Sequence, residues 1–285
     1  MVVFPNIKIN IGLSITSKRA DGYHNIESVM IPIPWCESLE VLEHSGEAAL
    51  EGVNAQQTEV GKVTFYSYGL PIPGKAEKNL CIRVFELLES WFNLPATDIH
   101  LLKALPIGAG LGAGSADAAF CLRALKDFYN LKISDFEAKE LLSKIGSDCP
   151  FFWDNKPVFA FGKGDELRPI DLDLSNYWIC LIHPNLAIST QEAYAGVNPK
   201  QPIIDLNLIA ALPIETWKEV VKNDFEDSLF PKYPLLEEIK NKLYGMDAVY
   251  ASMSGSGSTM YGIFDHEPRL PEEWLNYSNW IGKIT

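Results

Sequence analysis

Apolar and polar residues alternate near the start of the chain. Isoleucine or leucine fills every second position over 7–15, with Lys8 and Asn10 between them. A period of two predicts a β-strand that places Lys8 and Asn10 on one face. A polar, glycine-bearing loop follows, and two further segments, 26–33 and 38–42, also have extended patterns. The opening of the chain is therefore predicted to be rich in β-structure.

Apolar residues at helical spacing predict helices further along. Asn79 is a suitable N-cap for one helix, and the capping box Ser134–Glu137 opens another that Gly146 ends. After Phe152 the pattern predicts strands over 158–161, 178–183 and 261–264, and helices near 206–212, 215–221 and 235–244. Strands and helices interleave without regular βαβ alternation, which favours a mixed α+β chain in two lobes over a doubly wound parallel sheet.

A glycine-rich segment separates a predicted strand, 99–102, from a predicted helix that Ser115 could cap. Its glycines alternate with other residues, at Gly108, Gly110, Gly112 and Gly114. Residues without Cβ let several backbone N–H groups point at one spot, and the helix adds its positive dipole end. The pattern predicts a phosphate-binding loop, with a flexible connection as the alternative. It matches neither a Walker A loop nor Gly-x-Gly-x-x-Gly. A second loop of small residues, Ser254–Thr259, has the same character.

The composition limits the partners of such a loop. Lys and Arg total 24 against 37 Asp and Glu, a formal charge of -13, which argues against binding to nucleic acid or an anionic membrane. A polyanionic ligand is therefore expected to be held by local groups. The five cysteines are scattered, as expected for reduced thiols. The chain shows no apolar run long enough to span a membrane and no signal-peptide pattern, so a cytoplasmic location is expected.

Three motifs together resemble those of the GHMP small-molecule kinases. The segment from Pro106 to Ala119 resembles the phosphate-binding motif of that superfamily, Pro5–Leu13 its first motif and Met253–Ser258 its third. Three further segments, 18–24, 146–152 and 183–190, are similar to the branch that acts on a cytidine-diphosphate-linked sugar alcohol. The matches run from residue 5 to about residue 264, nearly the whole chain.

The resemblance implies a two-lobed α+β fold. Its N-terminal lobe would resemble the second domain of ribosomal protein S5 and its C-terminal lobe a ferredoxin, with the active site in the cleft between them. The implied domains are an ATP-binding domain over 1–155 and a C-terminal kinase domain over 156–285. The implied reaction moves the γ-phosphoryl group of ATP onto the C2 hydroxyl of 4-diphosphocytidyl-2-C-methyl-D-erythritol, in the non-mevalonate isoprenoid route. Mg²⁺ would arrive with the nucleotide, since the sequence has no dedicated metal cage.

Two residues are implied to be catalytic. The family places a base toward the acceptor hydroxyl at the position of Asp148, with Lys8 beside it. A nearby ammonium keeps the carboxylate ionised and stabilises charge on the moving phosphoryl group. Without the motif, Lys8 would be interpreted as an outward-facing strand lysine and Asp148 as a turn residue or helix cap.

The resemblance also implies the ligand contacts. Cytosine is expected against Tyr23 and His24, with Tyr194 on its opposite face and Asn10 at the sugar-alcohol end. The substrate phosphates are expected near Thr190, Ser256 and Gly257. The nucleotide is expected on Pro106, Gly108, Gly110, Leu111, Gly112, Gly114 and Ser115, with Lys103 and Asn79 near adenine. Taken singly, these residues would more often be packing groups.

The phosphate motif departs from the family pattern at three points. Ala109 and Ala113 replace glycine, and Asp117 follows Ala116 where the family usually has Ser-Asn. Alanine is strained at positive φ, so the loop either takes another path or has negative φ at these residues. Asp117 suits the positive end of the helix dipole but would repel phosphate. We therefore expect it to face away from phosphate or to lie near the metal.

Several alternatives stay open at this point. The chain could be another small-alcohol kinase, such as a homoserine or mevalonate kinase, or a non-catalytic nucleotide sensor of the same fold. A nucleic-acid binder is disfavoured by the acidic balance. The expected partners are ATP and the small-molecule substrate, with no nucleic acid and no membrane, and monomer and homodimer are both open. The tail after Phe264, which contains Trp274 and Trp280, is expected to dock.

Overall fold

The computed structural model describes residues 1–46, 52 and 54–284. Contacts within the chain divide it into two units, each built from separate stretches of sequence. Unit 1 comprises Met1–Ile7, Trp35–Ile107 and Ala113–Asn155, and unit 2 comprises Lys8–Pro34, Gly108–Gly112 and Lys156–Thr285. The division into domains over 1–155 and 156–285 stays a prediction. None of the described helices is long and apolar enough to cross a membrane.

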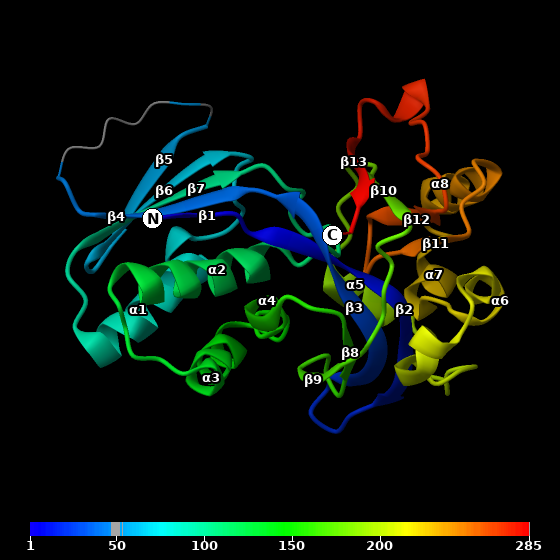
Figure 1. Cartoon of the computed structure of the whole chain (residues 1–285), viewed down its shortest axis with the longest axis horizontal. Coiled ribbons are helices and arrows are strands. Elements are labelled where there is room, and N and C mark those ends of the chain that lie inside the picture. The colour runs from blue at the N-terminus through cyan, green and yellow to red at the C-terminus, as the bar shows by residue number, and fades with distance from the viewer. Residues whose placement is uncertain (47–51, 53, 285) are drawn as a thin grey trace. The chain divides into compact units, whose positions relative to one another are not determined.

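Unit 1 contains a five-stranded sheet with two helices on one face (Figure 1). The strand order is β1 (Val2–Val3), β4 (Ser38–Glu43), β7 (Thr97–Lys103), β6 (Val63–Gly69) and β5 (Gln56–Val60). Only β6 and β7 run parallel among these neighbours. Helices α1 (Leu80–Phe92) and α2 (Ala113–Phe128) pack on the sheet, and α3 (Asp135–Ile145) and α4 (Phe151–Asp154) pack on α2. On β7, Ile99, Leu101 and Lys103 are buried, whereas Leu102 is exposed.

The predicted helix ends in unit 1 are confirmed with one exception. The Asn79 side chain caps α1 by accepting from the Cys81 N–H at 2.9 Å. The capping box of Ser134 and Glu137 opens α3, and Gly146 ends it. The prediction that Ser115 caps α2 is wrong, because the helix already begins at Ala113. Ala113 and Ala116 favour helix formation. Gly114, the last glycine of the predicted loop, therefore lies inside α2.

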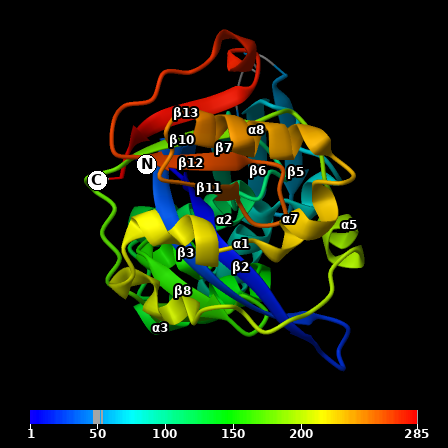
Figure 2. The same ribbon diagram turned by 90° about the vertical axis from the view of Figure 1, so that its right-hand side faces the viewer.

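Unit 2 contains two four-stranded sheets. One has the order β2 (Asn6–Lys18), β3 (His24–Cys36), β8 (Val158–Phe161) and β9 (Glu166–Pro169). The other has the order β11 (Tyr250–Met253), β12 (Met260–Phe264), β10 (Trp178–His183) and β13 (Ser278–Lys283), and all its neighbours are antiparallel. Helix α8 (Pro234–Gly245) packs on β11 and β12 (Figure 2). The remaining helices are α5 (Thr190–Ala195), α6 (Trp217–Val220) and α7 (Asp224–Leu229).

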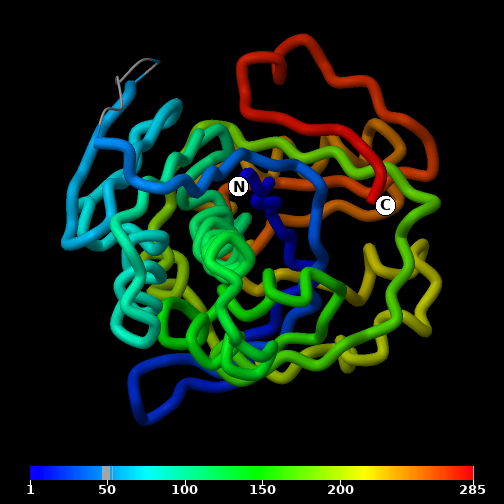
Figure 3. The backbone as a smooth tube through the Cα atoms, turned by 60° about the vertical axis from the view of Figure 1, so that its left-hand side comes forward, coloured from blue at the N-terminus to red at the C-terminus, as the bar shows by residue number. Residues whose placement is uncertain are grey.

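The docked C-terminal tail is confirmed. The red segment in Figure 3 returns as β13 and pairs with every residue of β10. Trp274, in a short 3-10 helix before β13, is buried in the same unit. The helices predicted near 206–212 and 215–221 are shorter, as 3-10 helices Leu206–Ala211 and Ile214–Thr216 followed by α6. The 3-10 form is common in such short connecting pieces.

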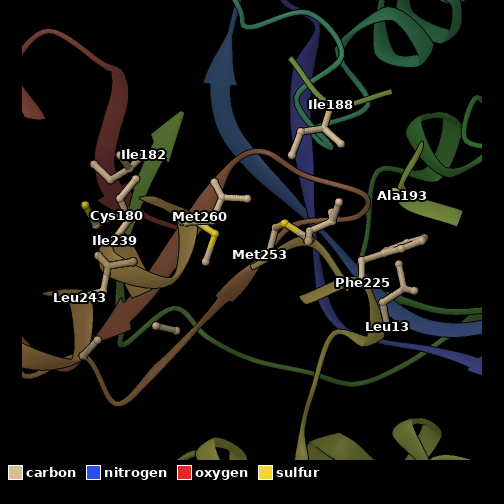
Figure 4. Close-up of a cluster of buried hydrophobic side chains, with 14 of the residues drawn as sticks. Leu13, Cys180, Ile182, Ile188, Ala193, Phe225, Ile239, Leu243, Met253 and Met260 are labelled. Carbon is tan, nitrogen blue, oxygen red and sulfur yellow. The ribbon is translucent and has the colours of Figure 1, made fainter. Parts of the chain in front are cut away.

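The core of unit 2 explains why β2 is buried on both faces. Leu13 of β2 joins an apolar cluster with Phe225 of α7 and with Met253 and Met260 of β11 and β12 (Figure 4). The polar face of the strand is also buried, since Lys8 and Asn10 are only 4% and 2% exposed. The alternative interpretation of Lys8 as an outward-facing strand lysine is therefore wrong. A buried ammonium needs partners, and these lie in the glycine loop and in Asn10.

Candidate active site

Strand β2 places Lys8 against the glycine loop. The Lys8 ammonium donates to the Asn10 side-chain oxygen and to the Gly110 carbonyl, the latter at 3.3 Å. The backbone N–H of Lys8 donates to the Leu111 carbonyl at 3.0 Å. Lys8 and Asn10 thus share one face, as the alternation predicts. The strand holds the ammonium against the loop by both its side chain and its backbone.

Asn10 orients Lys8. Its Nδ2 donates to Ser28 Oγ at 2.8 Å, and Ser28 Oγ donates to the Gly12 carbonyl at 2.6 Å. This fixed donor leaves the amide oxygen of Asn10 directed at the Lys8 ammonium. The backbone carbonyl of Asn10 accepts from the Tyr261 hydroxyl at 2.9 Å. Because these groups are buried and hydrogen-bonded, the lysine has one defined position.

The carbonyl groups of the glycine loop face protein donors. Gly110 O accepts from Ser254 Oγ at 2.9 Å in addition to Lys8, and Ala109 O accepts from the Thr259 N–H at 3.3 Å. Among the hydrogen bonds of the described residues, none is donated by the backbone N–H of Gly110, Leu111 or Gly112. Successive N–H groups left without a protein acceptor, directly before a helix, form an anion-binding nest.

The loop backbone requires glycine at Gly110. Its φ is +77°, and a Cβ there would lie 2.0 Å from the Ser254 carbonyl oxygen. Gly108 and Gly112 also have positive φ, at 67° and 70°. Ala109 and Ala113 are not among the residues with positive φ. The alternative of negative φ at these alanines is confirmed, so they replace the family's glycines without strain.

Asn223 fixes the third motif. Its Nδ2 donates to the carbonyls of Met253 and Gly255, both at 2.8 Å, and its Oδ1 caps α7 by accepting from the Phe225 N–H at 3.0 Å. Glu226 of the same helix accepts from the Met253 N–H at 2.8 Å. The sequence interpretation missed both residues, although an asparagine before an acidic first turn is an N-cap signal. Asn223 and Glu226 thus fix Met253 and Gly255, the residues directly before the predicted substrate contacts Ser256 and Gly257.

Helix α5 brings two predicted ligand residues together. Thr190 and Tyr194 lie four residues apart, on one face of a short helix that the sequence analysis did not predict. The Tyr194 ring stacks on His24 with centroids 4.9 Å apart and an interplanar angle of 16°. Tyr23 is 63% exposed, and the Lys163 ammonium lies 5.4 Å from its ring centroid. Unit 2 therefore presents an exposed tyrosine directly beside a stacked aromatic pair.

Asp148 of unit 1 lies between α3 and α4. It is half-buried, and Ser147 Oγ is 3.5 Å from its Oδ1. The next residue, Cys149, is buried, and this burial raises the pKa of its thiol to about 12. The following α4 is anchored by Arg123, which donates to the Trp153 carbonyl at 2.6 Å. Asp148 thus directly precedes a buried apolar segment.

Lys103 and Asp117 have partners inside unit 1. The Lys103 ammonium lies 2.5 Å from a Glu37 oxygen and 2.7 Å from Asp117 Oδ2. Glu37 is 66 residues away from Lys103 in sequence, and the sequence interpretation missed it. Asp117 faces this buried lysine. No group of three or more His, Cys, Asp and Glu residues in the described parts of the chain is arranged to hold a metal ion.

Comparison with known proteins identifies the family. The chain matches the GHMP kinases N terminal domain over residues 79–163 and the GHMP kinases C terminal domain over 208–277. A Parabacteroides distasonis protein named 4-diphosphocytidyl-2-C-methyl-D-erythritol kinase is 45% identical, with 100% of both chains covered. A Bacteroides fragilis protein of the same name is 44% identical over 95% of this chain and 94% of its own.

Solved structures agree in fold. A crystal structure of 4-(cytidine 5'-diphospho)-2C-methyl-D-erythritol kinase has a TM-score of 0.77 at 26% identity, with 99% of this chain and 98% of that chain covered. The Methanococcus jannaschii mevalonate kinase has a TM-score of 0.68 at 14% identity, covering 100% of this chain and 98% of its own, and so shares the fold. The predicted α+β GHMP-kinase fold is confirmed. The chain belongs to the GHMP kinase family and is similar over its full length to the 4-diphosphocytidyl-2-C-methyl-D-erythritol kinases.

Proposed function

We propose that this chain transfers the γ-phosphoryl group of ATP to the C2 hydroxyl of 4-diphosphocytidyl-2-C-methyl-D-erythritol. The observation that carries the proposal is the glycine loop, whose carbonyls accept from Lys8, Ser254 and Thr259 while the N–H groups of Gly110, Leu111 and Gly112 have no acceptor among the described residues. Such a loop suits a polyphosphate. Full-length relatives at 44–45% identity support the cytidylyl acceptor. The mevalonate kinase structure shares only the fold, at 14% identity.

In this proposal the phosphates of ATP bind the loop N–H groups. Helix α2 begins directly after Gly112 and adds the positive end of its dipole. Ser115, in the first turn of α2, would contact the same nucleotide, and Mg²⁺ would arrive with that nucleotide and keep several waters of its own. Bound Mg-ATP supplies the phosphoryl group and neutralises part of its charge. Pro106 and Leu111 are buried and fix the loop's path, while Gly108 and Gly114 leave room at its two ends.

The chemical step is assigned to two side chains. Asp148 accepts the proton of the C2 hydroxyl as that oxygen attacks phosphorus. Lys8, directed by Asn10, stabilises the negative charge on the transferring group. In this proposal Asn10 acts on the sugar-alcohol end mainly by orienting the lysine.

The cytidine end is assigned to unit 2. Cytosine stacks on the exposed Tyr23 ring, and the His24 imidazole and Tyr194 complete the base site. Thr190, Ser256 and Gly257 contact the diphosphate. We keep Asn79 near adenine, because only its Oδ1 accepts the hydrogen bond that caps α1 and its Nδ2 can still donate to the base. Lys103 is left out, because two carboxylates already occupy its ammonium. The residues over 1–155 would form the ATP-binding domain, and the cytoplasmic location stays a prediction.

The test is an acceptor panel combined with one substitution. The protein is incubated with Mg-ATP and the cytidylyl alcohol, mevalonate or homoserine, and ADP release is followed. Turnover is expected only with the cytidylyl alcohol. Asp148→Asn should lower kcat about 10²- to 10⁴-fold with little change in affinity for an ATP analogue. Asp154→Asn, an exposed acid six residues on that pairs with Lys139, is the matched control and should retain kcat. Turnover of mevalonate or homoserine alone, or full activity of Asp148→Asn, would refute the proposal.

A further inference from the structure

Unit 1 contains a cluster of three buried charged side chains. Glu37 precedes β4, Lys103 ends β7, and Asp117 is the fifth residue of α2. Their exposed fractions are 4%, 3% and 4%. Both carboxyl groups contact the ammonium, at 2.5 Å and 2.7 Å. We call these three residues the triad.

The triad holds both ends of the glycine loop. Lys103 is the last strand residue before the loop and Asp117 lies in the helix after it, 14 residues away in sequence. Glu37 Oε2 also accepts from the N–H groups of Ala104 and Leu105, at 3.0 Å and 3.1 Å. The strand exit and the helix start are therefore fixed to one another by charge-assisted hydrogen bonds, which are the strong ones.

The charges of the triad do not cancel if both carboxyl groups are ionised. Two carboxylates around one ammonium would leave a net negative charge in a buried site, which costs several kcal/mol in general. Asp117 Oδ1 is buried and has no hydrogen-bond partner among the described side chains. A proton on the carboxyl pair makes the triad neutral and gives one carboxyl a hydroxyl to donate.

The pKa shifts agree with this geometry. Burial raises the pKa of Asp117 well above its usual range, and the Glu37 carboxylate adds to the rise against the opposing effect of Lys103. Burial opposes the charge of Lys103, but Asp117 and Glu37 raise its pKa above the usual value. The Cys81 thiol of α1 faces the same site, and its own pKa is raised by its contact with Cys121 and by burial. Both directions favour a charged ammonium and a proton held on the carboxyl pair.

We propose that Glu37, Lys103 and Asp117 form a neutral triad, with one proton on the carboxyl pair, that positions the phosphate-binding loop for the nucleotide. The inference rests on the proposed role of the loop in ATP binding. All three are positioning residues, since they act through the backbone of the loop. An asparagine at position 117 reproduces a protonated carboxyl, because its oxygen accepts from Lys103 and its NH₂ donates to Glu37.

Calorimetric titration with a non-hydrolysable ATP analogue tests the positioning. Asp117→Asn should bind the analogue within about 3-fold of the parent, because the neutral triad is preserved. The double variant Lys103→Met/Glu37→Gln leaves a protonated Asp117 and no net charge in the cluster, so it should fold. It should bind the analogue at least about 10-fold more weakly than the parent, because the loop loses a charge-assisted hydrogen bond. The KM for the acceptor should change far less than the KM for ATP.

Asp98→Asn is the matched control. Asp98 is 2% exposed on the same strand and pairs with His44 at 2.7 Å, at the end of β7 remote from the loop. It should lower Tm and leave the analogue affinity unchanged. Infrared difference spectra of the parent against Asp117→Asn should show loss of one carboxylic-acid C=O band.

Four results overturn the triad. They are weak binding by Asp117→Asn, parental binding by the Lys103→Met/Glu37→Gln variant, equal loss of affinity in Asp98→Asn, and no carboxylic-acid band. A parent protein that does not bind the analogue refutes the proposed function itself, and the positioning role with it. Binding by the parent with any of those four results refutes the triad alone.

Discussion

A comparison of Gly110→Ala with Gly108→Ala separates the effect of backbone strain from the effect of a steric clash on the stability of the loop. Both residues have positive φ, +77° and +67°. Alanine in this region costs about 1 kcal/mol at either position. A Cβ on Gly108 meets no atom within 4 Å, whereas a Cβ on Gly110 would lie 2.0 Å from the Ser254 carbonyl oxygen. Since Cβ atoms do not approach closer than 3.0 Å, the loop must move by about 1 Å in Gly110→Ala.

The displacement breaks the two hydrogen bonds that Gly110 O accepts, from Ser254 Oγ at 2.9 Å and from the Lys8 ammonium at 3.3 Å. A neutral bond contributes about 1 kcal/mol and a charged one about 2 kcal/mol. With the backbone strain, Gly110→Ala should lower the free energy of unfolding by about 4 kcal/mol, against about 1 kcal/mol for Gly108→Ala.

Activity should follow the same order. A misplacement of about 1 Å at a site that positions reactants can cost about 100-fold in rate, so Gly110→Ala should lower kcat/KM for ATP by about that factor. Urea unfolding and steady-state kinetics measure the two quantities. Equal stability losses in Gly108→Ala and Gly110→Ala would refute the reasoning from the loop contact, even if both variants lost activity.

Three further predictions concern unit 2. Asn223→Ala removes two bonds to buried carbonyls and a helix cap, and should lower the free energy of unfolding by about 3 kcal/mol in urea titrations; a loss under 1 kcal/mol would contradict the assigned role. Burial lowers the pKa of His183, so the unfolded chain binds a proton first as pH falls, and stability should decrease below about pH 6.5. His183→Asn should flatten that slope. Tyr194→Ala, which loses the stack on His24, should raise KM for the cytidylyl acceptor up to about 10-fold with the KM for ATP unchanged.

Local patterns were sufficient to predict the elements that carry their own signals. The alternation over 7–15, the capping box of α3 and the N-cap of α1 each involve residues within a few positions of one another. Such short-range chemistry determines local structure directly. The short strands β1 and β13 have no such local signal. They are strands because β4 and β10 offer them partners distant in sequence, and no window of the sequence contains that information.

The site shows the same division between local and distant information. The glycines of the loop predict an anion-binding backbone, because positive φ is a property of the residue itself. The groups that hold the loop are remote, since Ser254 is 144 residues from Gly110. Which distant residue bonds to a given backbone group is decided by the tertiary fold, so the contacts of Asn223 and Glu37 could not be assigned from the motifs.

Lys103 illustrates how burial changes the meaning of a residue type. The sequence analysis expects Lys103 near adenine, because this lysine comes three residues before the proline that opens the phosphate motif. In the fold, β7 turns this side chain toward the helices, where it is 3% exposed. A lysine so buried must be paired or lose its charge, and Glu37 and Asp117 provide the pairing. The same positive charge then joins the strand before the loop to the helix after it, while in the proposed function the phosphates of ATP contact backbone N–H groups of the loop.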